Sequence, residues 1–260
     1  MVLSTKRHRG ANPQDSKCFD IEQLDKLKTA LNELSWLLNR GYTIGASNEL
    51  VGNHHQLTSR QRMAIARIAC TDEQIIKRKA KCLPVDKLKD KTVLIDGFNL
   101  LITIETALGG GVIFNCSDGC YRDLSSVYGS YKIVAETRAA IEYIGKILEL
   151  GEPKKVIWLF DRPVSNSAKV AELVHEIATK YNWPFESKTT DSTDSLLSKS
   201  PHTVVTCDSA ILERKKSWCN LAYTTITQQI SNAWIIDLID LKQEKTREKN
   251  SYLKSHFKTF

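Results

Sequence analysis

The sequence predicts an α/β fold, a three-layer sandwich with a mainly parallel sheet, preceded by a small all-helical domain. Apolar residues in the first part of the chain recur only at helical spacing. Further on, short and continuously apolar runs alternate with helical patterns, which is typical of strands buried on both faces of a parallel sheet. We therefore expect a basic helical domain, an α/β domain and a basic charged tail at residues 1–90, 91–240 and 241–260.

Two helical stretches make up the predicted N-terminal domain. Apolar residues recur at helical spacing over residues 20–38, which predicts an amphipathic helix. A second helix is expected to start at Thr58, because Thr58 and Gln61 form a capping box. Thr71 and Gln74 offer another box. This second stretch therefore forms one helix or two.

A polar, basic segment at residues 53–62 leads into the second helix. The free amides of a helix N-terminus can hold a phosphate, and Arg60 and Arg62 lie close behind as candidate substrate-binding residues. The alternative is an ordinary capped loop whose arginines point at water. His54 and His55 are adjacent in this segment, but a metal-binding pair is the weaker interpretation.

The α/β domain is expected to begin near residue 90, after a linker marked by Pro84 and a charged run. Beyond it, apolar runs and helical periodicity alternate. The expected strands lie at residues 93–95, 156–160 and 203–207, the helices at 133–150 and 169–181, and a last strand or short helix at 234–238.

The net charge of +7 is unevenly distributed. Residues 1–90 carry 16 Lys and Arg against 10 Asp and Glu, residues 91–240 carry 15 against 18, and residues 241–260 carry 6 against 2. Basic flanks around an acidic middle suit a protein that attracts a polyanion to a site holding cations. A polyanion is therefore the expected partner, and a homodimer is the oligomer allowed for. A solvated surface is the alternative.

The seven cysteines are scattered and odd in number, which favours reduced thiols. Cys116 and Cys120 lack a second ligand pair at suitable spacing, so a zinc site there is disfavoured. No apolar run approaches the roughly 20 residues of a membrane helix, and the first ten residues do not resemble a secretory signal. We expect a cytoplasmic protein without a membrane partner.

Three predicted strands are each followed at once by an aspartate, namely Asp96, Asp161 and Asp208. The carboxyl ends of parallel strands share one edge of a sheet, where ligands bind, so these acids should be neighbours. Such a cluster needs a compensating cation, and carboxylate oxygens suit Mg²⁺ or Mn²⁺ rather than zinc. Asp194 is expected to add a fourth acid from a short helix, with Asp191 as the competing choice. Taken singly, any of these aspartates would be interpreted as a cap or turn residue.

These motifs carry a family resemblance. Val-Leu-Ile-Asp-Gly-Phe-Asn-Leu at residues 93–100 resembles the opening strand of the PIN-like nuclease superfamily, in particular its NYN branch, in which an Asp and an Asn end that strand. Residues 204–212 are similar to the superfamily's later strand, which ends in Thr-x-Asp followed by an apolar pair. Residues 158–163 resemble the middle strand of the NYN branch. The resemblance covers residues 92–240 and implies a PIN-like sandwich.

The whole chain also resembles an uncharacterised family that joins a short helical domain to a PIN-like domain. Residues 9–15, 34–42 and 57–62 carry that likeness. The chain departs from the superfamily in two respects, a short spacing between two acids and a long insertion after the first strand. Asp194 and Asp208 stand only 14 positions apart, whereas the superfamily has a longer helix before its last strand.

A long insertion follows the first strand, from Glu105 through three glycines at residues 109–111 to Asp123. The glycines could let the backbone approach a phosphate, but no Gly-Lys-Ser/Thr follows, so a nucleoside-triphosphate loop is not expected. Glu105 is either an extra metal ligand or a helix-surface acid.

The resemblance implies hydrolysis of RNA phosphodiester bonds with Mg²⁺ or Mn²⁺ as cofactor. On this hypothesis Asp96 and Asp208 hold the principal ion. Asp161 and Asp194 hold its waters or a second ion, and Asn99 orients a water or a phosphate oxygen.

Arg122 and Arg162 are the candidates for neutralising the phosphate in this mechanism. A non-catalytic RNA-binding module of the same fold is the alternative function. A third interpretation is a metal-dependent phosphohydrolase acting on a small phosphate ester. The segment after Asp96 lacks the second aspartate of haloacid-dehalogenase-type phosphatases, so this interpretation ranks last.

Overall fold

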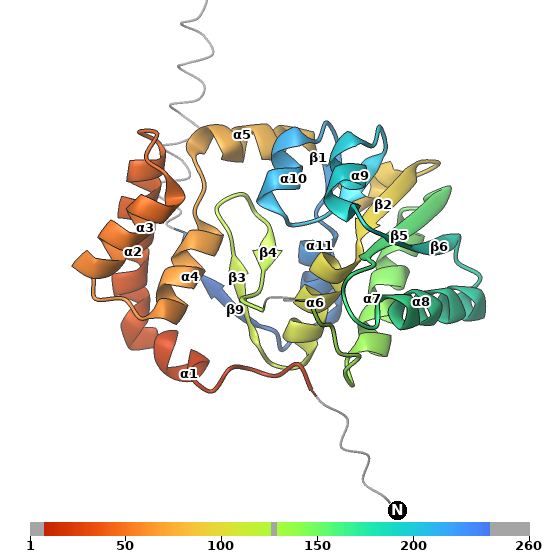
Figure 1. Ribbon diagram of the computed structural model, residues 1–260, viewed down its shortest axis with the longest axis horizontal. Coiled ribbons are helices and arrows are strands. Elements are labelled where there is room, and N and C mark those ends of the chain that lie inside the picture. Colours follow the sequence, from red (N-terminus) through yellow and green to blue (C-terminus); the bar gives the residue numbers. More distant parts are fainter. Residues whose placement is uncertain (1–7, 126–128, 240–260) are drawn as a thin grey trace, which may run out of the picture.

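A six-stranded, fully parallel sheet forms the centre of the computed structural model, which describes residues 8–125 and 129–239 (Figure 1). The mixed α/β class with a mainly parallel sheet and a helical N-terminal region is confirmed. In spatial order the strands are β1 (Cys82–Leu83), β8 (Trp218–Cys219), β7 (Thr203–Val205), β2 (Thr92–Asp96), β5 (Lys155–Asp161) and β6 (Phe185–Thr190).

The three strands predicted from apolar runs are the sheet's central members. β2 pairs with β5 in a register that sets Ile95 beside Trp158, and with β7 on its other side. Both side chains are fully buried, as expected for strands covered on both faces. β7 ends at Val205, two residues earlier than predicted.

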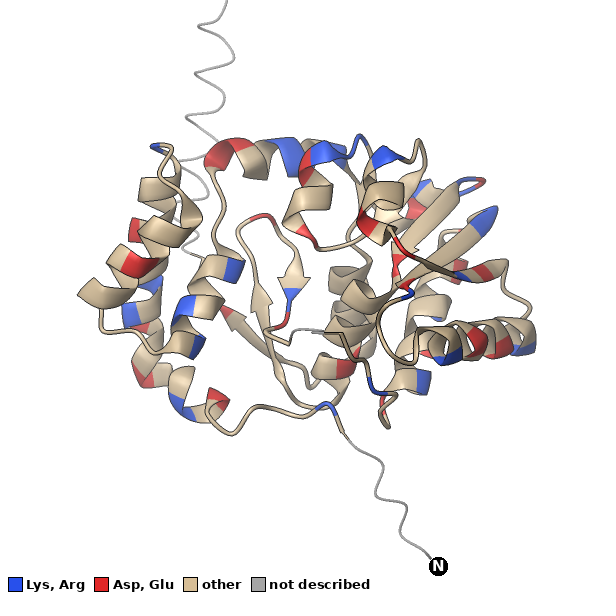
Figure 2. Cartoon of the chain, viewed as in Figure 1, with Lys and Arg blue, Asp and Glu red and all other residues tan. Residues whose placement is uncertain are grey.

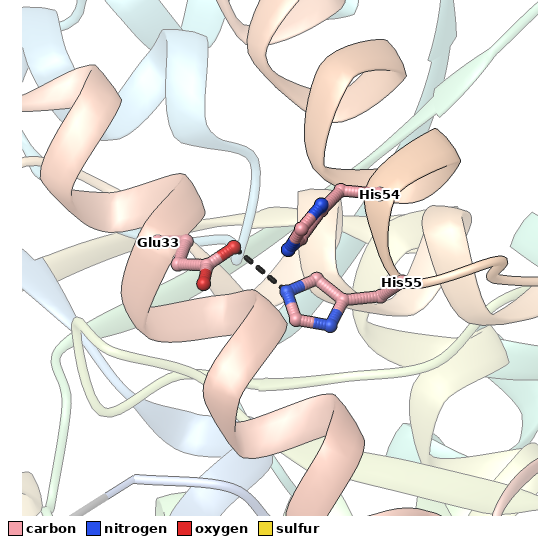
Figure 3. A group of neighbouring side chains, drawn as sticks. All are labelled: Glu33, His54 and His55. Atoms are coloured by element: carbon pink, nitrogen blue, oxygen red, sulfur yellow. Dashed lines mark hydrogen bonds and ion pairs between the residues drawn. The ribbon is translucent and has the colours of Figure 1, made fainter.

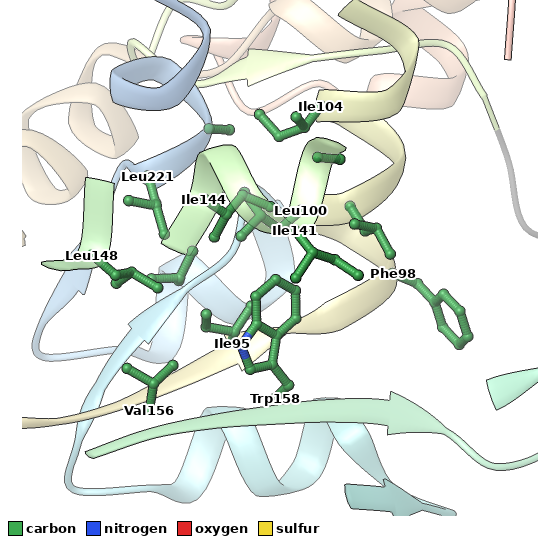
Figure 4. Packing of buried hydrophobic residues seen from close by; sticks show 14 of the residues in the cluster. Ile95, Phe98, Leu100, Ile104, Ile141, Ile144, Leu148, Val156, Trp158 and Leu221 are labelled. Carbon is green, nitrogen blue, oxygen red and sulfur yellow. The ribbon is translucent and has the colours of Figure 1, made fainter. Parts of the chain in front are cut away.

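Helices cover both faces of this sheet (Figure 1). One layer contains α6, α7, α8 and α11, and the other contains α9 and α10. Ile144 of α7 and Ile104 of α6 pack in one hydrophobic cluster with Ile95 and Trp158 of the sheet (Figure 4). The bounds are α6 (Gly97–Leu108), α7 (Thr137–Leu150), α8 (Ser167–Tyr181), α9 (Thr193–Lys199), α10 (Ser209–Arg214) and α11 (Leu221–Gln229). α7 starts four residues later than predicted.

The N-terminal region is helical, as predicted. The amphipathic helix is α2, capped by Asp20, and the stretch after Thr58 forms two helices, each with the predicted capping box. α1 and α3 were not predicted, and His54 is the last residue of α3 rather than part of a loop. The bounds are α1 (Asp15–Cys18), α2 (Ile21–Leu38), α3 (Ile44–His54), α4 (Ser59–Ile68) and α5 (Asp72–Lys81).

A second, three-stranded sheet joins the helical region to the rest of the molecule. It consists of β4 (Tyr121–Arg122), β3 (Val112–Asn115) and β9 (Trp234–Asp237), in that order. Phe114 of β3 and Ile236 of β9 share a hydrophobic cluster with Leu34 of α2 and Ile65 of α4. The predicted insertion thus supplies part of this sheet, and the segment at residues 234–238 is a strand.

A short helix and a short strand lie just before the predicted domain boundary near residue 90. The expected linker forms a short 3-10 helix, η1 (Val85–Leu88), whose Leu88 is buried in the central cluster. β1, which precedes it, is one of the two edge strands of the central sheet. None of the described helices is long and apolar enough to cross a membrane.

Candidate active site

Asp96 is the last residue of β2 and is almost fully buried. Its Oδ2 accepts a hydrogen bond from Thr206 Oγ1 at 2.8 Å. Burial raises the pKa of Asp96 to about 7, against the effect of the Thr206 bond. The negative charges of Asp208, Asp161 and Asp194 act in the same direction as burial. The aspartates predicted to be neighbours therefore interact electrostatically.

Asp208 and Asn99 tie the loop after β7 to its surroundings. Asp208 caps α10, because its Oδ1 accepts from the backbone amides of Ala210 at 2.7 Å and Ile211 at 3.2 Å. Asn99 Oδ1 accepts from the amide of Cys207 at 2.8 Å. Asn99 thus joins the first turn of α6 to the backbone that carries Asp208.

Asp161 ends β5 and is half-buried, whereas Asp194 lies in the first turn of α9 and is exposed. Desolvation, and then the charges of Asp208 and Asp161, raise the pKa of Asp194. Asp191 instead pairs with Arg162 at 2.9 Å. Asp194 and Asp191 are the two candidates for the fourth acid. Asp194 lines a cleft together with Asp96, Asp161 and Asp208, whereas Asp191 does not line it.

The four aspartates and Asn99 line one cleft of about 320 Å³, which Phe98 and Ile102 of α6 also line. Three unpredicted polar residues complete its described walls: Arg67, Asp123 and Ser125. Asp123 is buried and accepts bonds from Thr103 Oγ1 at 2.7 Å and the Ser125 amide at 2.6 Å. Arg67 comes from α4 and is exposed. Nothing in the sequence around Arg67 or Asp123 indicates that it lines this cleft, because both residues are remote in sequence from the ends of the central strands.

The carboxylates of the cleft are spread out. Within the described ranges, no three of them bring their oxygens within 4.8 Å of one another. Figure 2 shows acidic segments where the central strands end, basic segments along α4, and both acidic and basic segments along α5. The acidic cleft thus lies beside α4, whose exposed Arg67 lines it.

The prediction that Arg122 binds phosphate in this cleft is wrong. Arg122 is buried, and its two terminal nitrogens donate to Asp118 at 2.9 and 2.7 Å while its Nε donates to Cys207 O at 2.7 Å. Arg78 of α5 donates to the same carboxylate at 2.7 Å. Burial alone would raise the pKa of Asp118, but the two arginines outweigh it and hold that pKa well below its usual range.

The other three predicted arginines also lie outside the cleft lining. Arg60 pairs with the buried Asp15, with Nε at 2.5 Å from Oδ1. Arg62 donates to Leu57 O at 3.0 Å and so holds the turn before α4. Arg162 is exposed and paired with an acid of the β6–α9 turn. For Arg60 and Arg62 the structure corresponds to the capped-loop alternative, except that both arginines make contacts within the protein.

Glu105 is neither a metal ligand of the cleft nor a helix-surface acid. It is fully buried and accepts bonds from Arg9 Nε and Thr137 Oγ1, each at 2.6 Å, and from the Tyr131 hydroxyl. Burial raises its pKa, and the charge of Arg9 opposes that shift. Its partners show a structural role: it anchors the N-terminal segment to α6.

The glycines and cysteines of the insertion have structural surroundings too. A Cβ at Gly109 would lie 2.4 Å from Arg9 O, so this glycine admits the N-terminal segment. Cys116 and Cys120 are buried free thiols, and neither belongs to a metal-ligand group within the described part of the chain.

Two known protein families match two separate stretches of this chain. Residues 26–81 match the family described as a protein of unknown function, DUF434, and residues 85–224 match the domain of unknown function DUF5616. The uncharacterized protein MJ0935 of Methanocaldococcus jannaschii is 34% identical over 187 residues, which cover 72% of this chain and 89% of that protein. No solved structure matches the chain. With more than half of its length matched by one family model, the chain belongs to the DUF5616 family.

Proposed function

We propose that this protein is a Mg²⁺- or Mn²⁺-dependent ribonuclease whose active site is the aspartate cleft. The observation that carries the proposal is the buried Asp96, whose pKa is raised to about 7 among three further carboxylates. Of the described residues that line the cleft, Arg67 is the one cation. A bound divalent cation would relieve this repulsion. The resemblance of the three strand ends to PIN-like nucleases points to the same chemistry.

The donor set fits such an ion. Asp96 uses one carboxylate oxygen with Thr206, and Asp208 uses one in the α10 cap, which leaves the second oxygen of each for a metal. Mg²⁺ commonly binds through one or two carboxylates and keeps several waters, so the spread of the carboxylates is compatible with it. The ion would polarise a phosphate oxygen and lower the pKa of a water.

The remaining residues of the cleft would position the substrate. Asp161 and Asp194, at the more exposed side, would hold ordered waters. Asn99 has its Oδ1 occupied by the Cys207 amide, so its NH₂ group is the part that can donate to a phosphate oxygen. Arg67 would contact a phosphate of the RNA backbone. Attack of water on phosphorus and departure of the ribose oxygen would then cleave the strand.

The test is cleavage of labelled single-stranded and structured RNA with Mg²⁺ or Mn²⁺. The variants Asp96→Asn and Asp208→Asn keep the side-chain shape, and asparagine still caps a helix. Each should reduce the rate at least about 100-fold, because several kcal/mol of charge stabilisation is lost. Asp191→Asn is the matched control. Asp191 lies outside the cleft lining, so this variant should cleave RNA like the wild type.

Other outcomes distinguish the alternatives. Unchanged cleavage by the two cleft variants would assign the activity to a contaminating nuclease or to another site. The spread of the carboxylates also favours a second candidate, the non-catalytic RNA-binding module. Binding with a steep salt dependence and without cleavage would establish that function instead. Hydrolysis of a chromogenic phosphate ester, with RNA left intact, would identify a small-ester phosphohydrolase.

A further inference from the structure

A second group of metal-ligand side chains lies in the helical region, outside the cleft. Glu33 comes from α2, His54 is the last residue of α3, and His55 is the residue that caps α3. Their donor atoms all lie within 4.8 Å of one another, and His55 Nε2 is 2.7 Å from Glu33 Oε2. Figure 3 shows the two imidazoles and the carboxylate turned toward one another. The adjacent histidines alone do not form a site, but Glu33 supplies a third donor from another helix.

The backbone that carries the two histidines is held in place. Leu57 N donates to Gly52 O at 2.8 Å, which closes the turn after α3. Arg62 donates from Nε to Leu57 O and from a terminal nitrogen to Asn53 Oδ1, each at 3.0 Å. A Cβ at Gly52 would lie 2.6 Å from Arg62 Nε, so the glycine lets this arginine pack against α3. The ligand positions are thus fixed by contacts that do not involve the ligands.

The group is also accessible. The side chain of Glu33 is 45% exposed and that of His55 is 14% exposed. Glu33 and His54 line a pocket of about 660 Å³, whose walls include the exposed side chains of Trp36 and Leu50. An ion could therefore reach the three donors from solvent, and one side of it would stay open.

We propose that Glu33, His54 and His55 form a Zn²⁺ site with three protein ligands and an open fourth position. Two imidazoles and one carboxylate are donors that Zn²⁺ accepts, whereas imidazole does not suit Mg²⁺. With ligand bonds of about 2.0–2.1 Å, tetrahedral donors lie about 3.3 Å apart. His55 Nε2 and Glu33 Oε2 are 2.7 Å apart and every pair of donors lies within 4.8 Å, so small side-chain rotations are enough to reach that spacing. The bound ion would link α2 to the end of α3.

Isothermal titration of the full chain with Zn²⁺ alone tests this site. The protein is tag-free with its thiols reduced, and it carries Asp96→Asn and Asp208→Asn so that the aspartate cleft does not contribute. One equivalent should bind. Glu33→Gln, His54→Ala and His55→Ala should each weaken binding at least about 10-fold, the loss that even outer-shell changes cause. His202→Ala, which removes an exposed histidine elsewhere, should bind like its parent.

Two further measurements decide how the titration is interpreted. Co²⁺ in place of Zn²⁺ should give a visible absorption spectrum that the same three variants lose. Should His55→Ala unfold, His54→Ala is the decisive variant, because His54 is exposed and, unlike His55, its ring forms no ion pair with Glu33 among the described residues. Absence of Zn²⁺ binding, binding that survives all three substitutions, or equal affinity for Mg²⁺ would overturn the proposal.

Discussion

Asp96 and Asp118 are both buried aspartates of the same α/β region, yet their surroundings shift their pKa values in opposite directions. Asp118 is held by Arg78 and Arg122, and its pKa lies well below the usual range. Asp96 has a hydroxyl partner and carboxylate neighbours, and its pKa is raised to about 7. The chain therefore neutralises Asp118 with its own arginines, whereas the bond partner of Asp96 is the uncharged Thr206 hydroxyl.

The two regions are physically joined around Asp208. Arg122 Nε donates to Cys207 O at 2.7 Å, and an Arg78 terminal nitrogen donates to Ser209 O at 3.4 Å. The arginines that neutralise Asp118 therefore also hold the backbone on both sides of a cleft aspartate. A change at Asp118 should therefore be detectable at Asp208.

The largest effect is expected from Asp118→Asn. The substitution leaves Arg122 buried without its counter-charge and leaves Arg78 only the longer ion pair with Glu213 at 3.6 Å, so the free energy of unfolding should fall by about 3–5 kcal/mol. Urea unfolding measures it. Asp191→Asn, which breaks an exposed ion pair, should cost less than about 1 kcal/mol. Equal losses in the two variants would mean that the Asp118 network adds nothing beyond a surface pair.

The stability gap between wild type and Asp118→Asn should depend on pH. Because folding lowers the pKa of Asp118, its contribution is complete above the ordinary aspartate range, near pH 4, and is lost as the pH falls further. The gap should stay constant between about pH 6 and 8 and narrow below about pH 4. Unfolding curves over the range in which both proteins are folded measure it. A gap that widens in acid would contradict the assigned ion pair.

Asp96→Asn should have the opposite, smaller effect on stability. Because folding raises the pKa of Asp96 to about 7, the metal-free protein loses stability as the pH rises from about 4 to about 7, and the loss is complete above that range. The variant should be more stable than wild type by roughly 1–3 kcal/mol at pH 8, and the advantage should disappear near pH 4. Thermal unfolding in a chelator measures this. Added Mg²⁺ should stabilise the wild type and leave the variant unchanged.

The smallest effect is expected from Arg67→Gln. Loss of one phosphate contact should weaken RNA binding roughly 5- to 10-fold and reduce the salt slope by about 1. Binding is measured at several salt concentrations with the cleavage-deficient Asp208→Asn background. Arg138→Gln, which removes an exposed arginine paired with Glu176, is the matched control. If the two variants bind alike, Arg67 does not contact the RNA.

Local signals explain which parts of the fold could be predicted. Capping boxes at Thr58 and Thr71 and the apolar runs of β2 and β5 depend on neighbouring residues, so the sequence is sufficient there. α3 escaped prediction because Gly45, Ser47 and Asn48 weaken its helical pattern. β1 and β8 are only two residues long, and β6 is a polar edge strand. These elements form because of partners elsewhere in the chain.

The same distinction applies to the site. The rule that parallel strands end at one edge predicted that Asp96, Asp161 and Asp208 gather, and they line one cleft. Arg67 could not be found, because α4 reaches this edge only through the packing of the second sheet. Arg122 was misassigned because nothing in its own motif shows that Asp118 is buried beside it.

The second sheet also determines how late in synthesis the core of the helical region can be completed. β9 pairs in parallel with β3, and its Ile236 lies in the hydrophobic cluster that contains Leu27 and Leu34 of α2. Roughly 200 residues separate Leu34 from Ile236, and a ribosome adds them in about 10–40 s. Throughout that interval the hydrophobic cluster lacks the side chains of β9, so we expect part of the apolar surface of the first helices to stay exposed until this strand is synthesised.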